Sequence, residues 1–429
     1  MDILLVQPIG HRIGGVSADI ALFSDAFSML EVDVTLVTFD GILVNPKEKV
    51  RQITFCENHR TTAPFWKFLD KNFRIGSILE LNTWLDTFLT LSLVSKLAKK
   101  KHYDAIHILE SHPLLLPLIR LSFSLKDEML LLTVRSTRYS DNERNKKFKD
   151  AINKRDYKQI RGLIVQKIRD SNLANIILKY LFIKAKQRNR IALICESQGV
   201  KESYKDSFLA GDFNYIPIGI SETMEILPKS IARKYLKLAT NKTVLLSFGV
   251  NHRQKNLGIV FKAISSLPKN FTIIYAGKID HGLTTNDPEL LSKQYGLSDN
   301  TIINDGFIPQ EDTKYYFSAA DVIILSYTKD FLHGSGVLSF ATGYELPVIA
   351  SDIGQLGEFV RTKQLGLTFT PEDPISLRQA IIDFLKLPES EYKQMKNNLR
   401  TFAASNSWEV VAKKHLELYR NLANGNKGA

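Results

Sequence analysis

Apolar residues recur along this chain in short runs that alternate with helical spacings. The runs predict buried strands at residues 3–6, 32–38, 103–109, 130–134, 192–195 and 214–220. A second series of runs follows at residues 244–248, 272–275, 301–303, 322–325, 348–350 and 367–369. Between the runs, apolar positions three or four residues apart indicate helices. Alternation of this kind is typical of doubly wound parallel α/β sheets.

The alternation is interrupted near residues 221–230, and a full series of strands lies on each side of the break. We therefore predict an α/β protein with two doubly wound Rossmann-like domains that face each other across a cleft. The predicted domains are residues 1–220 and 221–406, and a chain of 429 residues is long enough for two cores.

One stretch, residues 326–358, has the order loop of small residues, helix and strand. Its loop contains Gly334, Ser335 and Gly336, and helical spacing begins at Val337. Backbone amides at such a helix start, together with the helix dipole, are suited to binding phosphate. Many loops of this kind only turn the chain, so the pattern by itself leaves both roles open.

Glycines and polar residues also follow several strands of the first series. Gly14 and Gly15 do not match the dinucleotide pattern GxGxxG, so they either form a tight turn or let a ligand approach the backbone. Glu110, His112 and Arg135 follow later strands, where they either line a crevice or take part in chemistry.

The net charge of +12 comes from one segment. Between Arg144 and Arg190 there are fifteen Lys and Arg residues but only three Asp residues. Apolar residues at helical spacing run through this segment, so it is either a helix with a solvated charged face or a surface for anionic lipid headgroups. We expect no nucleic-acid partner, because no array of stacking aromatic residues accompanies the charge.

The location of the protein is predicted from its cysteines and apolar runs. Cys56 and Cys195 have neither metal nor disulfide spacing, and no apolar run approaches the roughly 18 residues of a membrane span. The first residues predict a short strand rather than a signal peptide. We expect a cytoplasmic protein, with peripheral attachment to the inner face of the cytoplasmic membrane through residues 144–190 as the sharper hypothesis.

Several motifs in the second half are similar, in order, to those of one protein family. They are YIPIGIS at 215–221, SFGVNHRQKNLGIVFKAI at 247–264, DGFIPQEDTKYYFSAADVIILSY at 305–327 and SGVLSFATGYELPVIASDIGQLGEFV at 335–360. The set resembles the GT-B glycosyltransferases, specifically the retaining, nucleotide-sugar-dependent family 4. This resemblance implies a C-terminal helix, residues 407–423, that packs back on the N-terminal domain.

The resemblance also implies roles for individual residues. Lys255 is expected to bind the diphosphate of the donor, and Glu358 to lie near the sugar. Further residues implied in donor binding are the backbone of Ser335, Gly336 and Val337 around the diphosphate, Phe307 and Ile308 beside the base, Gly249 in the lysine loop, Arg253 as a source of positive charge, and Gly14 and Gly15 in the N-terminal loop.

The chain departs from the family pattern at four positions. One of them is Leu109, where the family has a histidine in the crevice. The family commonly has two glutamates where this chain has Leu332 and Phe340, and an arginine where it has Val250. These departures fit either a divergent active branch or a catalytically inactive binding or scaffold partner. Lys255 is likewise either a diphosphate ligand or a solvated surface lysine.

The implied function is hexosyl transfer with retention, from a UDP- or GDP-sugar to a glycan or lipid-linked acceptor, in the synthesis of cell-envelope polysaccharide or glycolipid. No Asp-x-Asp motif stands out in the sequence. We therefore expect an enzyme without metal or cofactor, in which cations and helix amides stabilise the leaving diphosphate.

Overall fold

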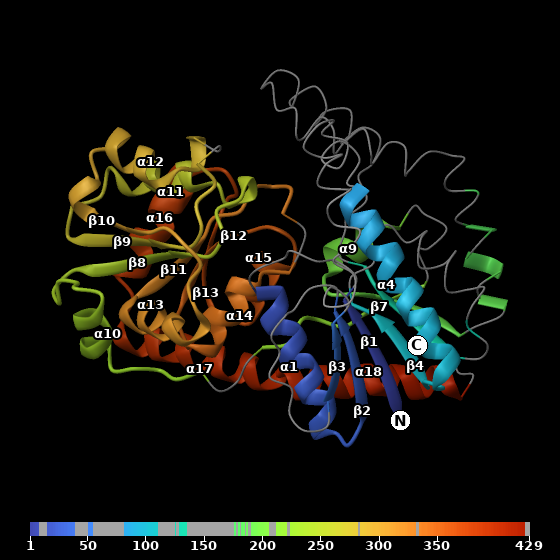
Figure 1. The fold of residues 1–429 in the computed structure, drawn as a ribbon. Coiled ribbons are helices and arrows are strands. Elements are labelled where there is room, and N and C mark those ends of the chain that lie inside the picture. The colour runs from blue at the N-terminus through green and yellow to red at the C-terminus, as the bar shows by residue number, and fades with distance from the viewer. Residues whose placement is uncertain are drawn as a thin grey trace. The chain divides into compact units, whose positions relative to one another are not determined.

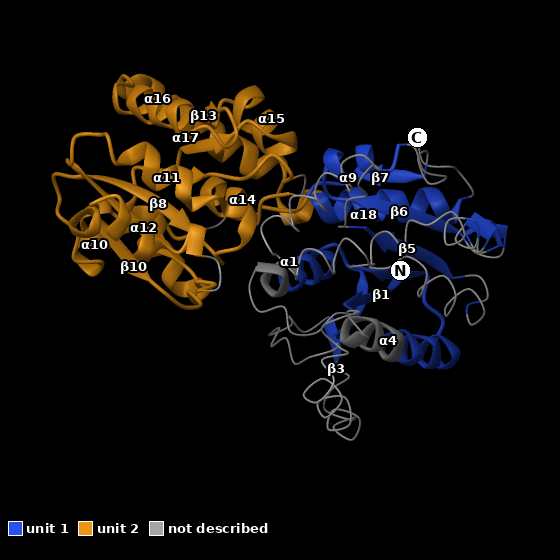
Figure 2. Ribbon diagram, turned by 90° about the horizontal axis from the view of Figure 1, so that it is seen from above, with its two compact units in different colours: residues 1–217, 411–429 blue, residues 218–410 orange. Residues whose placement is uncertain are grey.

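The structure is a computed structural model, and its chain divides into two compact units. It describes residues 1–7, 15–38, 50–54, 81–109, 125, 128–134, 176, 179–180, 182–184, 186–187, 190–205, 212–220, 224–281, 284–331 and 334–424. Unit 1 contains residues 1–217 and 411–429, and unit 2 contains residues 218–410 (Figure 2). The borders predicted from the sequence, 220 and 406, differ from these by a few residues.

Unit 1 is built on a parallel sheet whose described strands have the order β3-β2-β1-β4-β5-β6-β7 (Figure 1). The strands are β1 (Asp2–Gln7), β2 (Asp33–Thr38), β3 (Val50–Thr54), β4 (Ala105–Ile108), β5 (Met129–Thr133), β6 (Ile191–Cys195) and β7 (Phe213–Tyr215). The helices that the structure describes over their full length are α1 (Gly15–Met29), α4 (Leu81–Lys100), α9 (Gln198–Ser203) and α18 (Trp408–Ala423). Strand β3 was not predicted from the sequence.

The C-terminal helix α18 packs on unit 1, as predicted. Successive residues of a strand point to opposite faces of a sheet. In β4, Ile106 and Ile108 belong to the apolar core that includes α4. His107 between them bonds the hydroxyl of Tyr419 in α18 through Nδ1 at 2.7 Å, and that of Thr133 through Nε2 at 2.7 Å. This buried polar contact fixes α18 against the sheet.

Unit 2 is built on a second parallel sheet, whose described strands have the order β10-β9-β8-β11-β12-β13. The strands are β8 (Thr243–Phe248), β9 (Phe271–Ala276), β10 (Thr301–Asn304), β11 (Val322–Leu325), β12 (Val348–Ser351) and β13 (Gly366–Phe369). The helices are α10 (Lys229–Tyr235), α11 (Leu257–Ile264), α12 (Pro288–Gln294), α13 (Thr313–Ala319), α14 (Gly336–Gly343), α15 (Gly354–Thr362), α16 (Pro374–Leu385) and α17 (Glu389–Ser405).

Helices cover both faces of the second sheet. Residues of α11, α12 and α16 form one apolar core with the strands, and residues of α10, α13, α14, α15 and α17 form another (Figure 1). Both sheets are therefore doubly wound, and the prediction of two Rossmann-like domains is confirmed. No helix among the described residues is both long and apolar enough to cross a membrane.

The loops at the carboxyl ends of β8, β9 and β10 are packed directly on one another. Gly277 has φ of +150°, and a Cβ atom there would lie 2.2 Å from the carbonyl oxygen of Gly249. Only glycine permits this approach. The amide of Gly277 in turn donates to the carbonyl of Asn304 at 3.0 Å. Ligands of doubly wound folds bind at this edge of the sheet.

Candidate functional site

Lys255 and the start of α14 meet at Gly249. Lys255 ends the short 3₁₀ helix η2 (Arg253–Lys255), in the loop that follows β8. A Cβ atom on Gly249 would lie 3.2 Å from Lys255 Nζ and 3.4 Å from Val337 Cγ2. Gly249 itself has φ of +90°, a conformation that favours glycine. The loop glycine therefore leaves space between a cation and the first turn of a helix.

Lys255 is not the solvated surface lysine that the sequence left as an alternative. Only 7% of the residue is exposed, and Nζ donates to the carbonyl of Phe248. Because burial disfavours the charged form, the pKa of the ammonium is lowered to about 7. An anion next to Nζ would restore the charge, so the group is suited to a phosphate ligand.

The lysine loop is fastened to the loop that follows β11. Ser326 Oγ donates to the carbonyl of Lys255 at 2.7 Å. The backbone carbonyl of Gln254 accepts from the amide of Thr328 at 2.9 Å, and its side-chain Nε2 donates to the carbonyl of Asp330 at 3.1 Å. The position of the lysine is thus set by two loops rather than one.

Ser335 caps the start of α14 with its side chain. Its Oγ accepts from the amide of Leu338 at 3.2 Å and lies 3.3 Å from the hydroxyl of Tyr327. The amides of Gly336 and Val337 precede the first bonded turn and have no carbonyl partner within the helix. These amides and the helix dipole favour an anion at this point.

Phe307 and Ile308 lie in the loop that follows β10. Phe307 is 59% exposed, whereas Ile308 packs partly buried against the core of unit 2. Asp305 holds this loop, because its Oδ1 accepts from the amide of Ile279 at 2.8 Å. An exposed aromatic ring on a fixed loop at this edge can stack on a planar base.

The other predicted site residues are less closely associated. Arg253 is exposed, and its carbonyl accepts from Asn286 Nδ2 at 3.2 Å. Glu358 is exposed on α15, and no hydrogen bond or ion pair joins it to Lys255 or Ser335 among the described residues. Gly15 begins α1 in unit 1, and Gly14 lies outside the described residues. Glu110, His112 and Arg135 also lie outside them.

Phe340 is partly buried and packs against the apolar core of unit 2. Its ring centroid lies 5.9 Å from that of Phe317 and 6.1 Å from that of Phe248. The side chain therefore stabilises the packing of α14 and cannot bind a sugar hydroxyl. Leu332, the other position that commonly holds a glutamate, lies outside the described residues.

The structure adds residues for which no role was predicted. Ser326 and Tyr327 connect the lysine loop with the helix start, and the ring of Tyr327 stacks on that of Phe331 at 3.8 Å. Their place directly after a predicted strand was the available signal. Among the described residues, no cluster of three or more His, Cys, Asp or Glu could hold a metal ion.

Two Rossmann-like domains, with a buried lysine near a helix start in the second, define the class of doubly wound α/β proteins. Within this class, residues 228–402 match the family model of the glycosyl transferases group 1. The match lies in the second domain and covers less than half of the chain. No match was found among the curated proteins.

Solved structures are similar over nearly the whole chain. A glycosyltransferase from Rickettsia africae ESF-5 is 18% identical, with 99% of each chain covered and a TM-score of 0.69. Sucrose-phosphate synthase from Thermosynechococcus elongatus is 20% identical, with 99% of this chain and 100% of that chain covered and a TM-score of 0.68. HepE from Anabaena, in complex with UDP, is 16% identical, with 98% and 100% covered and a TM-score of 0.68. These likenesses show the GT-B fold, and the family match supports a glycosyltransferase.

Proposed function

We propose that the protein is a retaining glycosyltransferase of the family 4 type, which transfers a hexosyl group from a UDP- or GDP-sugar. The observation that carries this proposal is the meeting of Lys255 Nζ and Val337 at Gly249. That arrangement brings the lysine ammonium near the first turn of α14, and a cation together with helix amides is suited to a diphosphate.

The chemistry follows from stabilisation of the leaving group. The bond between the anomeric carbon and the diphosphate oxygen breaks, and the acceptor oxygen forms a bond to the same face of that carbon. The leaving phosphate takes the proton of the acceptor, so no strong protein base is required. Lys255 and the amides of Gly336 and Val337 stabilise the charge that develops on the diphosphate. We propose that this step needs neither metal nor cofactor.

The nucleotide is proposed from one similar solved structure and from the loop of Phe307 in this chain. HepE from Anabaena was solved with UDP and with UDP-glucose. In this chain, Phe307 offers an exposed ring beside the same edge of the sheet, where the uracil or guanine of the donor would stack. We assign Gly249, Arg253 and Ile308 to the same donor site, and Glu358 to the sugar.

We propose a glycan or lipid-linked acceptor and attachment of the protein to an anionic membrane. In the basic segment, Ile176, Tyr180 and Ile183 are 66%, 61% and 45% exposed. They are four and three residues apart, which is the spacing of one helix face. Lys184 Nζ lies 5.9 Å from the ring centroid of Tyr180. Exposed apolar residues beside lysines are typical of helices that lie on anionic lipid.

The decisive experiment is calorimetric titration with UDP, GDP and their sugars. The wild-type protein should bind one of the nucleotides, and Lys255→Ala should lower the rate of donor turnover about a hundredfold. Lys262→Ala, which changes an exposed lysine on α11, should leave both binding and turnover unchanged. Normal turnover in Lys255→Ala would reject the role of this lysine.

A second candidate function is a catalytically inactive partner of a true transferase. The observation that favours it is the packing of Phe340 against the core, at a position where the family commonly has a glutamate. Binding of a nucleotide without turnover of any UDP- or GDP-sugar would favour this candidate over the enzyme.

A further inference from the structure

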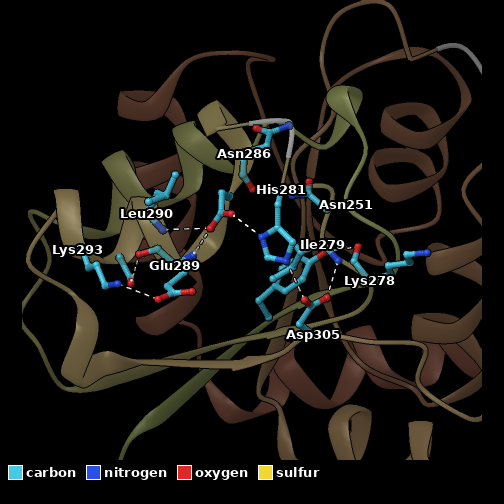
Figure 3. A network of polar contacts seen from close by, with 12 residues as sticks. Asn251, Lys278, Ile279, His281, Asn286, Glu289, Leu290, Lys293 and Asp305 are labelled. Carbon is cyan, nitrogen blue, oxygen red and sulfur yellow. Dashed lines mark hydrogen bonds and ion pairs between the residues drawn. The ribbon is translucent and has the colours of Figure 1, made fainter.

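A histidine outside the expected donor site lies between two carboxylates. His281 follows β9, and its Nδ1 lies 3.1 Å from Asp287 Oδ2 while its Nε2 lies 3.1 Å from Asp305 Oδ2 (Figure 3). The His281 side chain is 63% exposed, but that of Asp287 is only 6% exposed. Both ring nitrogens face an acceptor, so only the imidazolium can donate to both.

One of these carboxylates controls the loop of Phe307. Asp305 stands two residues before Phe307, and its second oxygen, Oδ1, accepts from the amide of Ile279 at 2.8 Å. The Gly306 amide donates to the carbonyl of Gly277 at 3.4 Å. The path of this loop therefore depends on bonds to the segment that carries His281.

The other carboxylate belongs to a segment that holds the lysine loop. Asp287 caps α12 by accepting from the amides of Glu289 at 2.9 Å and Leu290 at 3.1 Å. Its neighbour Asn286 is buried and donates through Nδ2 to the carbonyls of His252 at 3.3 Å and Arg253 at 3.2 Å. These two residues directly precede Gln254 and Lys255.

Asn251 closes this connection from the other side. It is 1% exposed, and its Nδ2 donates to the carbonyl of Asn286 at 2.7 Å. Hydrogen bonds thus link Asp305 through His281 to Asp287, and the adjacent residue Asn286 continues the connection to the lysine loop, all in one unit of the chain.

We propose that His281, as an imidazolium, is a positioning residue that holds the Phe307 loop and the Lys255 loop at the separation that a nucleoside diphosphate requires. This inference rests on the proposed function of the same site. When the ring is neutral, one of the two carboxylates loses its donor and the loops are joined less firmly. His281 does not touch the reacting atoms in this role.

The charge around the ring sets the sign of the pH dependence. The hydrogen bond to Asp287, followed by that to Asp305, raises the pKa of His281 above its usual 6.5. The contribution of the imidazolium is therefore complete at low pH and is lost as the pH rises through the raised pKa. The other charged groups nearby are Lys278 and Asp280 on the same loop, and Glu289, which pairs with Lys293. Lys278 extends away from the ring in Figure 3.

The test measures UDP and GDP affinity by calorimetry at pH 6 and pH 9. His281→Asn should bind the nucleotide about tenfold more weakly than wild type at pH 6, because two charge-assisted bonds are lost. At pH 9, the ratio of the dissociation constants of His281→Asn and wild type should approach one. His281→Arg keeps a cation at both pH values, so it should bind as tightly as wild type at pH 6 and more tightly at pH 9. Titration of Lys255 and of the nucleotide affects every variant alike and cancels in these ratios.

Control variants separate positioning from folding. His102→Asn changes an exposed histidine of unit 1 and should leave the ratio at one. Asp305→Asn should reproduce the weakened binding of His281→Asn at pH 6. In His281→Asn, hydrogen exchange should quicken at residues 253–257 and 305–309 and stay unchanged in α16 and α17.

Three results would overturn the inference in distinguishable ways. If wild type binds a nucleotide and His281→Asn binds it equally at both pH values, the positioning role is wrong and the proposed function stands. If wild type binds no nucleoside diphosphate at either pH, the proposed function fails and this inference fails with it. A deficit in His281→Asn that is equal at pH 6 and pH 9 would show a purely structural role.

Discussion

At the scale of single residues, the proposed donor site depends on Lys255, a lysine that is buried away from water. The role of Lys255 was implied by the resemblance of its loop, which follows a strand, to a family motif. Its hydrogen bonds reach Phe248 and Ser326, which lie in two other segments of the chain. The lowered pKa of this lysine was therefore not predictable from local pattern.

The lowered pKa predicts that binding of UDP or GDP takes up a proton. With a pKa of about 7, Lys255 is mostly neutral in the free protein at pH 8. A diphosphate beside Nζ favours the ammonium, so binding at pH 8 should take up close to one proton. At pH 6 the lysine is already charged, so its uptake of protons on binding should be near zero.

Calorimetric titration at pH 8 in buffers of different ionisation enthalpy measures this uptake. Lys255→Ala should bind the nucleotide without proton uptake. Lys262→Ala, which changes an exposed lysine, should take up protons as wild type does. Binding to wild type at pH 8 with no proton uptake would contradict the assignment of Lys255 to the diphosphate.

At the scale of elements, the strands and most helices follow from periodicity. Runs such as Val322–Leu325 are apolar throughout because both faces of a doubly wound sheet are covered. Strand β3 was missed, since VRQIT contains only three apolar or β-branched residues beside two polar ones. The helix predicted around 407–423 is α18, but its fixing to the sheet depends on His107, far away in the chain.

The packing of α18 predicts that unit 1 loses stability in acid. His415 of α18 is buried, and burial lowers its pKa to about 4, while its Nδ1 lies 2.9 Å from the carbonyl of Val411. In the unfolded chain this histidine titrates near 6.5. The unfolded state therefore binds more protons between pH 6.5 and pH 4, and stability falls as the pH falls through this window, by roughly 3 kcal/mol in total.

Thermal unfolding of wild type and His415→Phe between pH 7 and pH 4 checks this expectation. The phenylalanine fits a site lined by the rings of Phe23 and Phe27 and has no charge to lose. The variant should lose less stability than wild type on acidification, and hydrogen exchange should assign the difference to α18. Equal losses in the two proteins would show that His415 does not contribute.

At the scale of the whole molecule, the charge is concentrated in one segment of the first unit. The excess of twelve positive charges between Arg144 and Arg190 equals the net charge of the chain. Basic residues near an anionic membrane each contribute about 1 kcal/mol, and salt screens this attraction. The exposed apolar residues at 176, 180 and 183 would add burial in the interface.

Membrane attachment is tested by sedimentation with vesicles. Vesicles rich in phosphatidylglycerol should sediment the protein at low salt and release most of it at about 1 M salt, where the screening length is short. Replacement of Ile176, Tyr180 and Ile183 by serine should weaken binding, whereas the matched change of the exposed Ile231 and Tyr235 in unit 2 should not. Failure to sediment at low salt would reject the membrane proposal.

The sequence by itself determined the fold class, the break between two strand series and the stretch with the phosphate-type helix start. These features are local, because periodicity and small residues act over a few positions. Only the tertiary structure decided that Lys255 is buried, that it meets Val337 at Gly249, and that His281 joins Asp287 to Asp305. Those contacts depend on the order in which parallel strands lie side by side, which brings together loops that are distant in the chain.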